Sequence, residues 1–193
     1  MREGLRMIIV LTCICAGSGF LLASVKQWTE PKIENQILTH VKGPAVMAVL
    51  PPHDNDPIMD RRSFVMPDGG EAVVFPAVSG GELRAVALER TAEGYGGPLG
   101  VMVGFEVGEE ALTGIAVTTH RETPGVGSRV TLPGFTRQFG GHPFSQLILR
   151  SGGGDIDAVS GATVSSKAAI SAVNKAVEDY RAIAPSLREA FGS

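Results

Sequence analysis

The chain has 193 residues, a formal net charge of −3 and a charged-residue content of 19%. This length suits one domain of ordinary size with an appendage, and the charge offers no basic field to nucleic acid, which we exclude as a partner. Both cysteines, Cys13 and Cys15, lie near the N-terminus, so thiolate metal sites, disulfides and a cysteine nucleophile are excluded from the rest of the chain.

The strongest physical signal is the segment over residues 7–25, which contains no charged side chain. At about 1.5 Å per residue, such a helix spans a bilayer core of about 30 Å. Arg2 and Arg6, within residues 1–6, precede it and favour a cytoplasmic N-terminus, with the rest of the chain on the outer side of the membrane. A cleaved signal peptide is the alternative, but the apolar run exceeds the usual length of about 7–15 residues. We therefore predict a retained transmembrane helix.

Residues 26–60 are predicted to be a helical connector and a linker. Pro31 suits the first position of a new helix, which would run to about Lys42 and end at Gly43-Pro44. The stretch "LPPHDNDP" over residues 50–57 is rich in proline and aspartate, as is typical of a linker or turn.

Residues 61–193 are predicted to form the folded domain. Short apolar or alternating runs ("SFVM", "EAVVFPAV", "ELRAVALER", "PLGVMVGFEV" and "LTGIAVTTH") predict strands, separated by glycine-containing turns such as the hairpin at 108–110. From Val164 the spacing of apolar residues predicts an amphipathic helix that packs on the sheet and ends at Pro185. The predicted fold is α+β, a single antiparallel-rich domain with flanking helices, preceded by one transmembrane helix.

The start of this last helix carries the stretch "DAVSGAT" over residues 157–163. Ser160 suits the N-cap and Gly161 allows a tight entry, so free N–H groups and the positive end of the helix dipole would suit a phosphate. Asp155 and Asp157 would repel a phosphate unless a metal or a covalent link intervenes. A capping turn without a ligand is the alternative that these residues leave open.

The same stretch resembles the acceptor motif of flavin-transferase substrates, Asp-x-x-Ser/Thr-Gly-Ala-Thr. In such proteins FMN is attached as a phosphoester, through its phosphate, to the hydroxyl of the final threonine. The resemblance also implies that the transferase reads the initial aspartate. Ser165 and Ser166 are nearby hydroxyls that compete with the threonine as acceptors. The cofactor-binding residues that the motif implies are Asp157, Ser160, Gly161, Ala162 and Thr163.

A second stretch, "HRETPGVG" over residues 120–127, is similar to the His-x-Glu-Thr-Pro-Gly-x-Gly string of FMN-binding domains. Physically, a proline and two glycines make a restrained loop whose backbone can approach a flat ring closely; alone, the stretch reads equally as an ordinary turn. The cofactor-binding residues that it implies are Glu122, Thr123, Pro124, Gly125, Val126 and Gly127. A weaker match at 93–97 puts Tyr95 beside the flavin, with a core aromatic as the alternative.

Nearly the whole chain resembles the G subunit of Rnf (also called Rsx) complexes, which are membrane-bound, ion-translocating ferredoxin:NAD oxidoreductases. The C subunit of the Na⁺-translocating NADH:quinone reductase carries a related domain. The resemblance implies an electron-transfer subunit of a translocase, with covalent FMN on Thr163 and no catalytic acid or base. It implies multi-span membrane subunits and iron–sulfur subunits as partners, and a flavin transferase for maturation. Val126 and Ser165 stand where leucine and threonine are common in the family.

Three other functions stay open from the residues. The domain could serve a membrane-anchored FMN reductase or sensor outside an Rnf complex. It could also be the C subunit of the quinone reductase, or a binding module without a cofactor. The histidines show no zinc-binding spacing, so no metal site is predicted.

Overall fold

The computed structural model describes residues 2–37, 42–66 and 68–191, and the chain forms two compact units, Met1–His40 and Val41–Ser193. The first unit is helix α1 (Arg2–Ile37). Over Arg2–Thr29 this helix is long and apolar enough to cross a membrane, and no other helix in the described ranges is.

Helix α1 is longer than the predicted transmembrane segment, and the predicted separate helix from Pro31 does not occur. Pro31 lies inside α1, which continues to Ile37, because a proline removes one backbone hydrogen bond and leaves the others intact. The predicted end near Lys42 adjoins residues 38–41, which lie outside the described residues. Gly43-Pro44 begins helix α2 (Gly43–Val49) instead of ending a helix, since a proline in the first turn has no hydrogen bond to lose.

The second unit is built on a five-stranded antiparallel sheet in the order β1-β2-β3-β4-β5. Each strand pairs with the next one along the chain, as the apolar runs and their glycine turns predict. Gly108 adopts a φ of +98° in the turn between the last two strands. The strands are β1 (Arg62–Val65), β2 (Glu71–Ser79), β3 (Glu82–Glu93), β4 (Pro98–Glu106) and β5 (Leu112–Thr119). The predicted α+β fold is confirmed.

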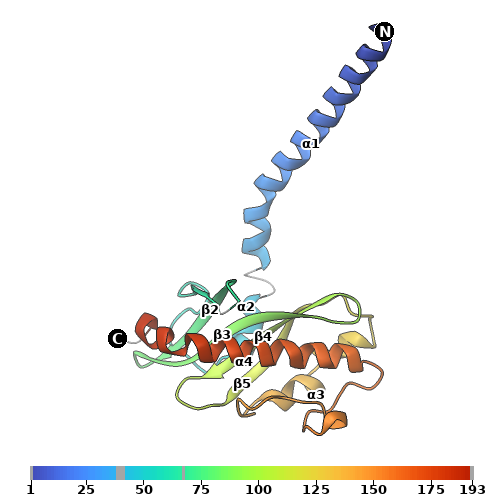
Figure 1. The fold of residues 1–193 in the computed structure, drawn as a ribbon. Helices are drawn as coiled ribbons and strands as arrows, with labels where there is room; N and C mark the ends of the chain where they lie inside the picture. The colour runs from blue at the N-terminus through green and yellow to red at the C-terminus, as the bar shows by residue number, and fades with distance from the viewer. Residues whose placement is uncertain (1, 38–41, 67, 192–193) are drawn as a thin grey trace. The chain divides into compact units, whose positions relative to one another are not determined.

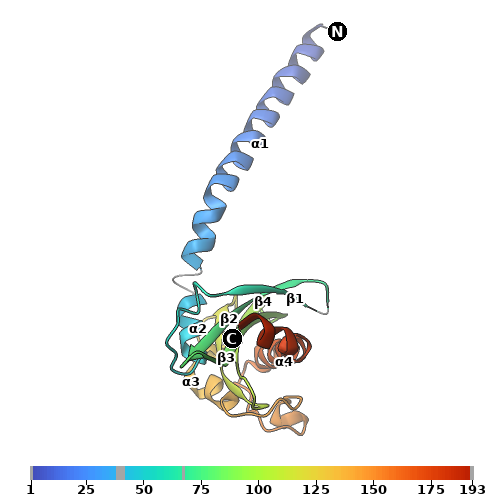
Figure 2. The same cartoon turned by 90° about the vertical axis from the view of Figure 1, so that its left-hand side faces the viewer.

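Helices α2 and α4 (Thr163–Phe191) cover opposite faces of this sheet, as Figures 1 and 2 show. Helix α4 packs on β3 and β4, and α2 packs on β4 and β5. Because both faces of β4 are covered, every residue between its two ends is buried. On the α4 side, the ring of Phe105 stacks on that of Tyr180 with 4.6 Å between centroids. The hydrophobic core therefore lies between α4 and the sheet.

Helix α4 does not end at Pro185 as predicted, but continues to Phe191. Ile183 and Leu187, on either side of the proline, are buried in the core. Their burial offsets the hydrogen bond that the proline removes.

Residues 50–60, predicted to belong to a linker, are bonded to β2. The Asp54 N–H donates to the carbonyl of Val78 over 2.8 Å. The Asn55 side chain accepts the Val78 N–H over 2.8 Å and donates to the Pro76 carbonyl over 3.0 Å. This stretch therefore packs with the second unit, which begins at Val41.

Between β5 and α4 the chain forms short helices separated by loops. They are η2 (Gly127–Thr131), α3 (Pro133–Thr136), η3 (Arg137–Phe139) and η4 (Arg150–Gly152). The last of them leads through residues 153–162 into α4. The whole segment between β5 and α4 contains the motif over residues 120–127 and leads into the motif over residues 157–163, which ends at the first residue of α4.

Candidate functional site

A cavity of about 430 Å³ lies at the N-terminal end of α4. Its volume is within the range of about 300–1,000 Å³ that is typical of small-molecule sites. Three stretches that are far apart in the sequence meet there. The lining residues are Tyr95, Glu122, Thr123, Val126, Gly127, Gly161, Ala162, Thr163, Val164 and Ser165.

The first turn of α4 presents free backbone N–H groups at this cavity. The helix begins at Thr163, and the Ala162 carbonyl accepts its first helical hydrogen bond, from the Ser166 N–H, over 2.9 Å. Ala162 is therefore the N-cap, and Ser160, predicted for that role, lies in the preceding turn, where Gly161 adopts a φ of +78°. Alanine has no side-chain acceptor for the first-turn N–H groups, so these are available to a ligand.

The hydroxyl groups at the start of α4 are not equivalent. Thr163 is exposed, whereas Ser165 and Ser166 are buried, with relative exposures of 1% and 0%. The Ser165 hydroxyl donates to Glu122 Oε2 over 2.8 Å. The Ser166 hydroxyl donates to the Ala162 carbonyl and accepts the Val159 N–H, both over 3.0 Å. Thr163 is therefore the exposed residue of the three, and the hydroxyls of Ser165 and Ser166 are held in hydrogen bonds inside the protein.

Glu122 lies just beyond β5 with 5% of its surface exposed. Its Oε1 accepts the Tyr95 N–H over 2.8 Å and its Oε2 accepts the Ser165 hydroxyl. A Cβ at Gly94 would lie 2.1 Å from Oε1, and a Cβ at Gly127 would lie 2.5 Å from Oε2. Two glycines of the sequence motifs are therefore required by the space that this carboxylate occupies.

The loop after Glu122 turns tightly and only partly faces the cavity. The carbonyl of Thr123 accepts the N–H groups of Val126 and Ser128, each over 3.2 Å. Gly125 adopts a φ of +74°, which favours glycine. Thr123, Val126 and Gly127 line the cavity, whereas the exposed Pro124 and Gly125 do not.

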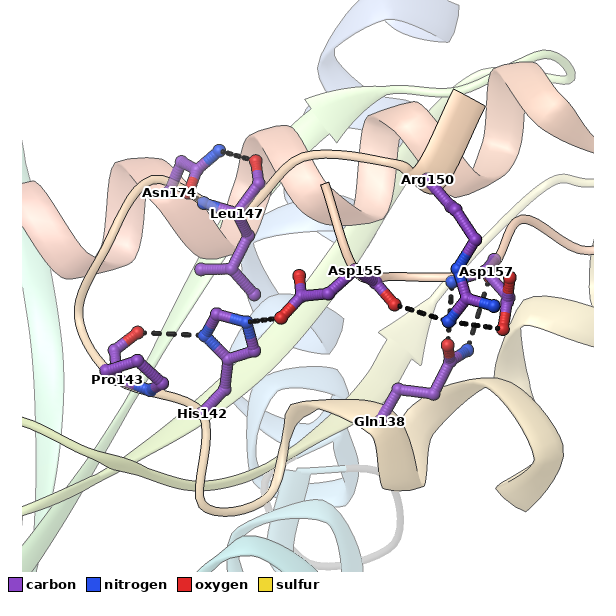
Figure 3. A network of polar contacts seen from close by, with 8 residues as sticks. All are labelled: Gln138, His142, Pro143, Leu147, Arg150, Asp155, Asp157 and Asn174. Atoms are coloured by element: carbon purple, nitrogen blue, oxygen red, sulfur yellow. Dashed lines mark hydrogen bonds and ion pairs between the residues drawn. The ribbon is translucent and has the colours of Figure 1, made fainter. Parts of the chain in front are cut away.

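Asp157 and Ser160, both predicted to bind the cofactor, line an adjoining cleft of about 230 Å³ instead. Asp157 pairs with Arg150 at 3.2 Å between Oδ2 and Nη2. The side chain of Gln138 accepts the Asp157 N–H over 2.7 Å and donates to its carbonyl over 3.2 Å, as Figure 3 shows. Sequence reasoning missed Gln138 and Arg150, because no motif surrounds either of them.

Asp155 belongs to the same network (Figure 3), and its Oδ2 lies 2.7 Å from His142 Nε2. This hydrogen bond lowers the pKa of the Asp155 carboxyl below its ordinary value. Neither Asp155 nor Asp157 lines the cavity, and each is paired with a basic side chain. These two carboxylates therefore lie outside the cavity, and the carboxylate that lines it is that of Glu122.

Comparison with known proteins bears on this site. Residues 94–178, which include most of the cavity, match the family model of the FMN-binding domain. The chain is 31% identical to the G subunit of the ion-translocating oxidoreductase complex of Methanosarcina acetivorans, over 92% of this chain and 94% of the relative. It is also 31% identical to the G subunit of the complex of that name from Pseudomonas aeruginosa strain PAO1, over 94% of this chain and 90% of the relative. The chain belongs to the family of these G subunits.

A solved structure agrees with the fold of this family member. The crystal structure of Shewanella oneidensis NqrC superposes with a TM-score of 0.53 at 24% identity, covering 74% of this chain and 73% of that one. The resemblance to the G subunit of Rnf complexes is confirmed. The relatives are subunits of an oxidoreductase complex, which supports an oxidoreductase role with FMN for this chain.

The cavity residues fit FMN chemically. The uncapped first turn of α4 suits a phosphate, because its N–H groups and dipole favour an anion. The exposed Thr163 hydroxyl stands at the same helix end. The side chains of Tyr95, Val126 and Val164 are exposed to 75%, 43% and 51%, and they offer apolar contact surface to a flat ring.

Proposed function

We propose that this member of the G-subunit family carries FMN as a phosphoester on Thr163. It transfers electrons within a membrane-bound ferredoxin:NAD oxidoreductase of the Rnf type, which couples electron flow to ion translocation. The observation that carries the proposal is the contrast among the hydroxyls at the start of α4: Thr163 is exposed at the cavity, and Ser165 and Ser166 are buried and bonded.

Attachment forms a bond between Thr163 Oγ1 and phosphorus, and the hydroxyl proton leaves. Condensation with a free phosphate is unfavourable in water, so the donor is a flavin whose phosphate is held in a phosphoanhydride. The anhydride P–O bond breaks, and the second phosphate group leaves and takes up the hydroxyl proton. A flavin transferase brings this donor to the chain. Asp157 is the exposed first residue of the motif that ends at Thr163, and it pairs with Arg150. We assign it to recognition by the transferase.

In the protein with FMN attached, the residues of the cavity would bind the cofactor and orient it. The first-turn N–H groups of α4 stabilise the phosphate charge. Val126, Val164 and Tyr95, which line the cavity, would offer apolar contacts to the ring. Bound FMN supplies one- and two-electron chemistry, so the chain needs no acid or base of its own.

Helix α1 anchors the protein in the membrane. Arg2 and Arg6 hold the N-terminus on the cytoplasmic side, and the second unit lies on the outer side, where a covalent bond retains a cofactor that cannot be replaced from the cytoplasm. The multi-span and iron–sulfur subunits of the complex are the electron partners.

The test is a denaturing gel of the full chain produced in cells that contain the transferase. We expect flavin fluorescence in the wild-type band and in Ser166→Ala, detectable fluorescence in Ser165→Ala, which loses one hydrogen bond to Glu122, and none in the shape-matched Thr163→Val. Mass spectrometry of the peptide containing Thr163 locates the adduct. A dark wild-type band, or fluorescence that survives Thr163→Val and disappears in Ser165→Ala, contradicts the proposal.

A further inference from the structure

Glu122 joins three segments that are separate in the sequence. It lies in the loop after β5, its Oε1 accepts the Tyr95 N–H of the turn between β3 and β4, and its Oε2 accepts the Ser165 hydroxyl of α4. We propose that Glu122 is a positioning residue, whose carboxylate fixes Tyr95 relative to the first turn of α4, and thereby relative to Thr163.

The surroundings of the carboxylate show that it is built into the site. Within the described residues no lysine or arginine forms an ion pair with Glu122. Each of its two oxygens instead accepts a hydrogen bond from a different segment, Oε1 from the turn that contains Tyr95 and Oε2 from the first turn of α4. Gly94 and Gly127 enclose it, and a Cβ at either position would overlap one oxygen. Neither glycine adopts a positive φ, so space and not backbone conformation requires them. The carboxylate is the nearest group at both positions, and at Gly94 the Gly97 carbonyl also lies within 2.9 Å.

The geometry also predicts which substitutions keep the two hydrogen bonds of Glu122, to the Tyr95 N–H and the Ser165 hydroxyl, which together we call the bridge. Glutamine has the same length, and its carbonyl can accept the Tyr95 N–H while its NH₂ donates to Ser165, because a hydroxyl can rotate to accept. Alanine removes both acceptors and leaves the Tyr95 N–H without its partner. Glu122→Gln should therefore retain the arrangement, and Glu122→Ala should lose it.

The test uses the full chain in detergent micelles, labelled with ¹⁵N-tyrosine. The chain has two tyrosines, so the spectrum contains the amides of Tyr95 and Tyr180, and the second, inside α4, reports whether the fold is intact. In Glu122→Ala we expect the Tyr95 amide signal to shift and its hydrogen exchange to accelerate on the order of tenfold, as for the loss of a partly buried hydrogen bond. In Glu122→Gln both should stay close to wild type.

Wild-type shift and exchange of Tyr95 in Glu122→Ala would overturn the proposal. If Glu122→Ala also loses the Tyr180 signal, Glu122→Gln decides. Retention of both amides then supports the bridge, and loss of Tyr95 alone refutes it. This measurement needs no flavin, and Thr163→Val should give the wild-type result.

The consequence for Thr163 rests on the proposed function. With the transferase present, the flavin-labelled fraction should fall in Glu122→Ala and be restored in Glu122→Gln. An unlabelled wild type refutes the proposed function and leaves the Tyr95 result to decide the role of Glu122.

Discussion

Gly127 provides a quantitative test of how tightly Glu122 and Ser165 are packed at the cavity. A Cβ at this position would lie 2.5 Å from Glu122 Oε2, 2.9 Å from Glu122 Cβ and 3.1 Å from Ser165 Oγ. Gly127→Ala must therefore displace the carboxylate from its hydrogen bond. Overpacking costs about 1–3 kcal/mol, and a buried hydrogen bond to a charged group contributes about 1.5–3 kcal/mol. Together these effects should lower the free energy of unfolding by about 2.5–6 kcal/mol.

Two other glycines separate steric from backbone effects. Gly125 has open space around it but a φ of +74°, so Gly125→Ala should cost only the left-handed backbone penalty of about 1–2 kcal/mol. Gly134, in α3, has open space and no positive φ. Gly134→Ala should be neutral or stabilise by up to about 1 kcal/mol, because alanine loses less backbone entropy in a helix.

The assay is urea unfolding of the three variants in detergent, followed by circular dichroism. The order of stability should be Gly134→Ala, then Gly125→Ala, then Gly127→Ala. If Gly127→Ala unfolds at the same urea concentration as Gly134→Ala, Glu122 does not fill the space that the structure assigns to it.

Three further predictions concern α4 and the polar network. Asp179→Ala leaves Arg90, whose side chain is 11% exposed, without its partner, and should lower the free energy of unfolding by about 3–5 kcal/mol in urea titrations. The pKa of Asp155 is lowered in the folded state by its hydrogen bond with His142. The stability that this contributes is therefore complete above the ordinary value of 3.8 and is lost as the pH falls through the lower folded value. Unfolding followed from pH 5 downward should accordingly show a weaker acid dependence in Asp155→Asn than in wild type. Pro185→Ala restores a helical N–H inside α4 and should raise the free energy of unfolding, by up to about 3 kcal/mol.

Each of these has its control or contrary outcome. Lys175 pairs with Asp68 at the surface, with 48% and 44% of the side chains exposed, so Lys175→Ala should cost no more than about 1 kcal/mol. An Asp179→Ala loss of that same size would mean that burial does not strengthen the α4–β3 pair. Equal acid dependence in Asp155→Asn and wild type, or destabilisation by Pro185→Ala, would contradict the other two.

Elements and turns were predictable because their causes are local. Strands β2 to β5 follow from short apolar runs bounded by glycine turns, and the start of α4 follows from the apolar spacing after Val164. The motif residues of the candidate site were also visible as consecutive letters. Boundaries at prolines were predicted wrongly at Pro31 and Pro185, because a proline's local cost can be outweighed by the rest of a helix and by core packing.

The roles of single polar residues were decided by the tertiary structure. From the sequence, Ser165 is an alternative acceptor to Thr163. In the structure its hydroxyl donates to Glu122, 43 residues away in the sequence. Asp179 lies in no motif of the sequence, yet it is buried and pairs with Arg90, 89 residues away in the sequence. Sequence spacing reports which side chains share a face of one element. The hydrophobic core brings distant elements together, and their arrangement determines which side chains are buried and which partners they bond to. For this reason the tertiary structure, and not the sequence, distinguishes the exposed Thr163 from the buried Ser165 and Ser166.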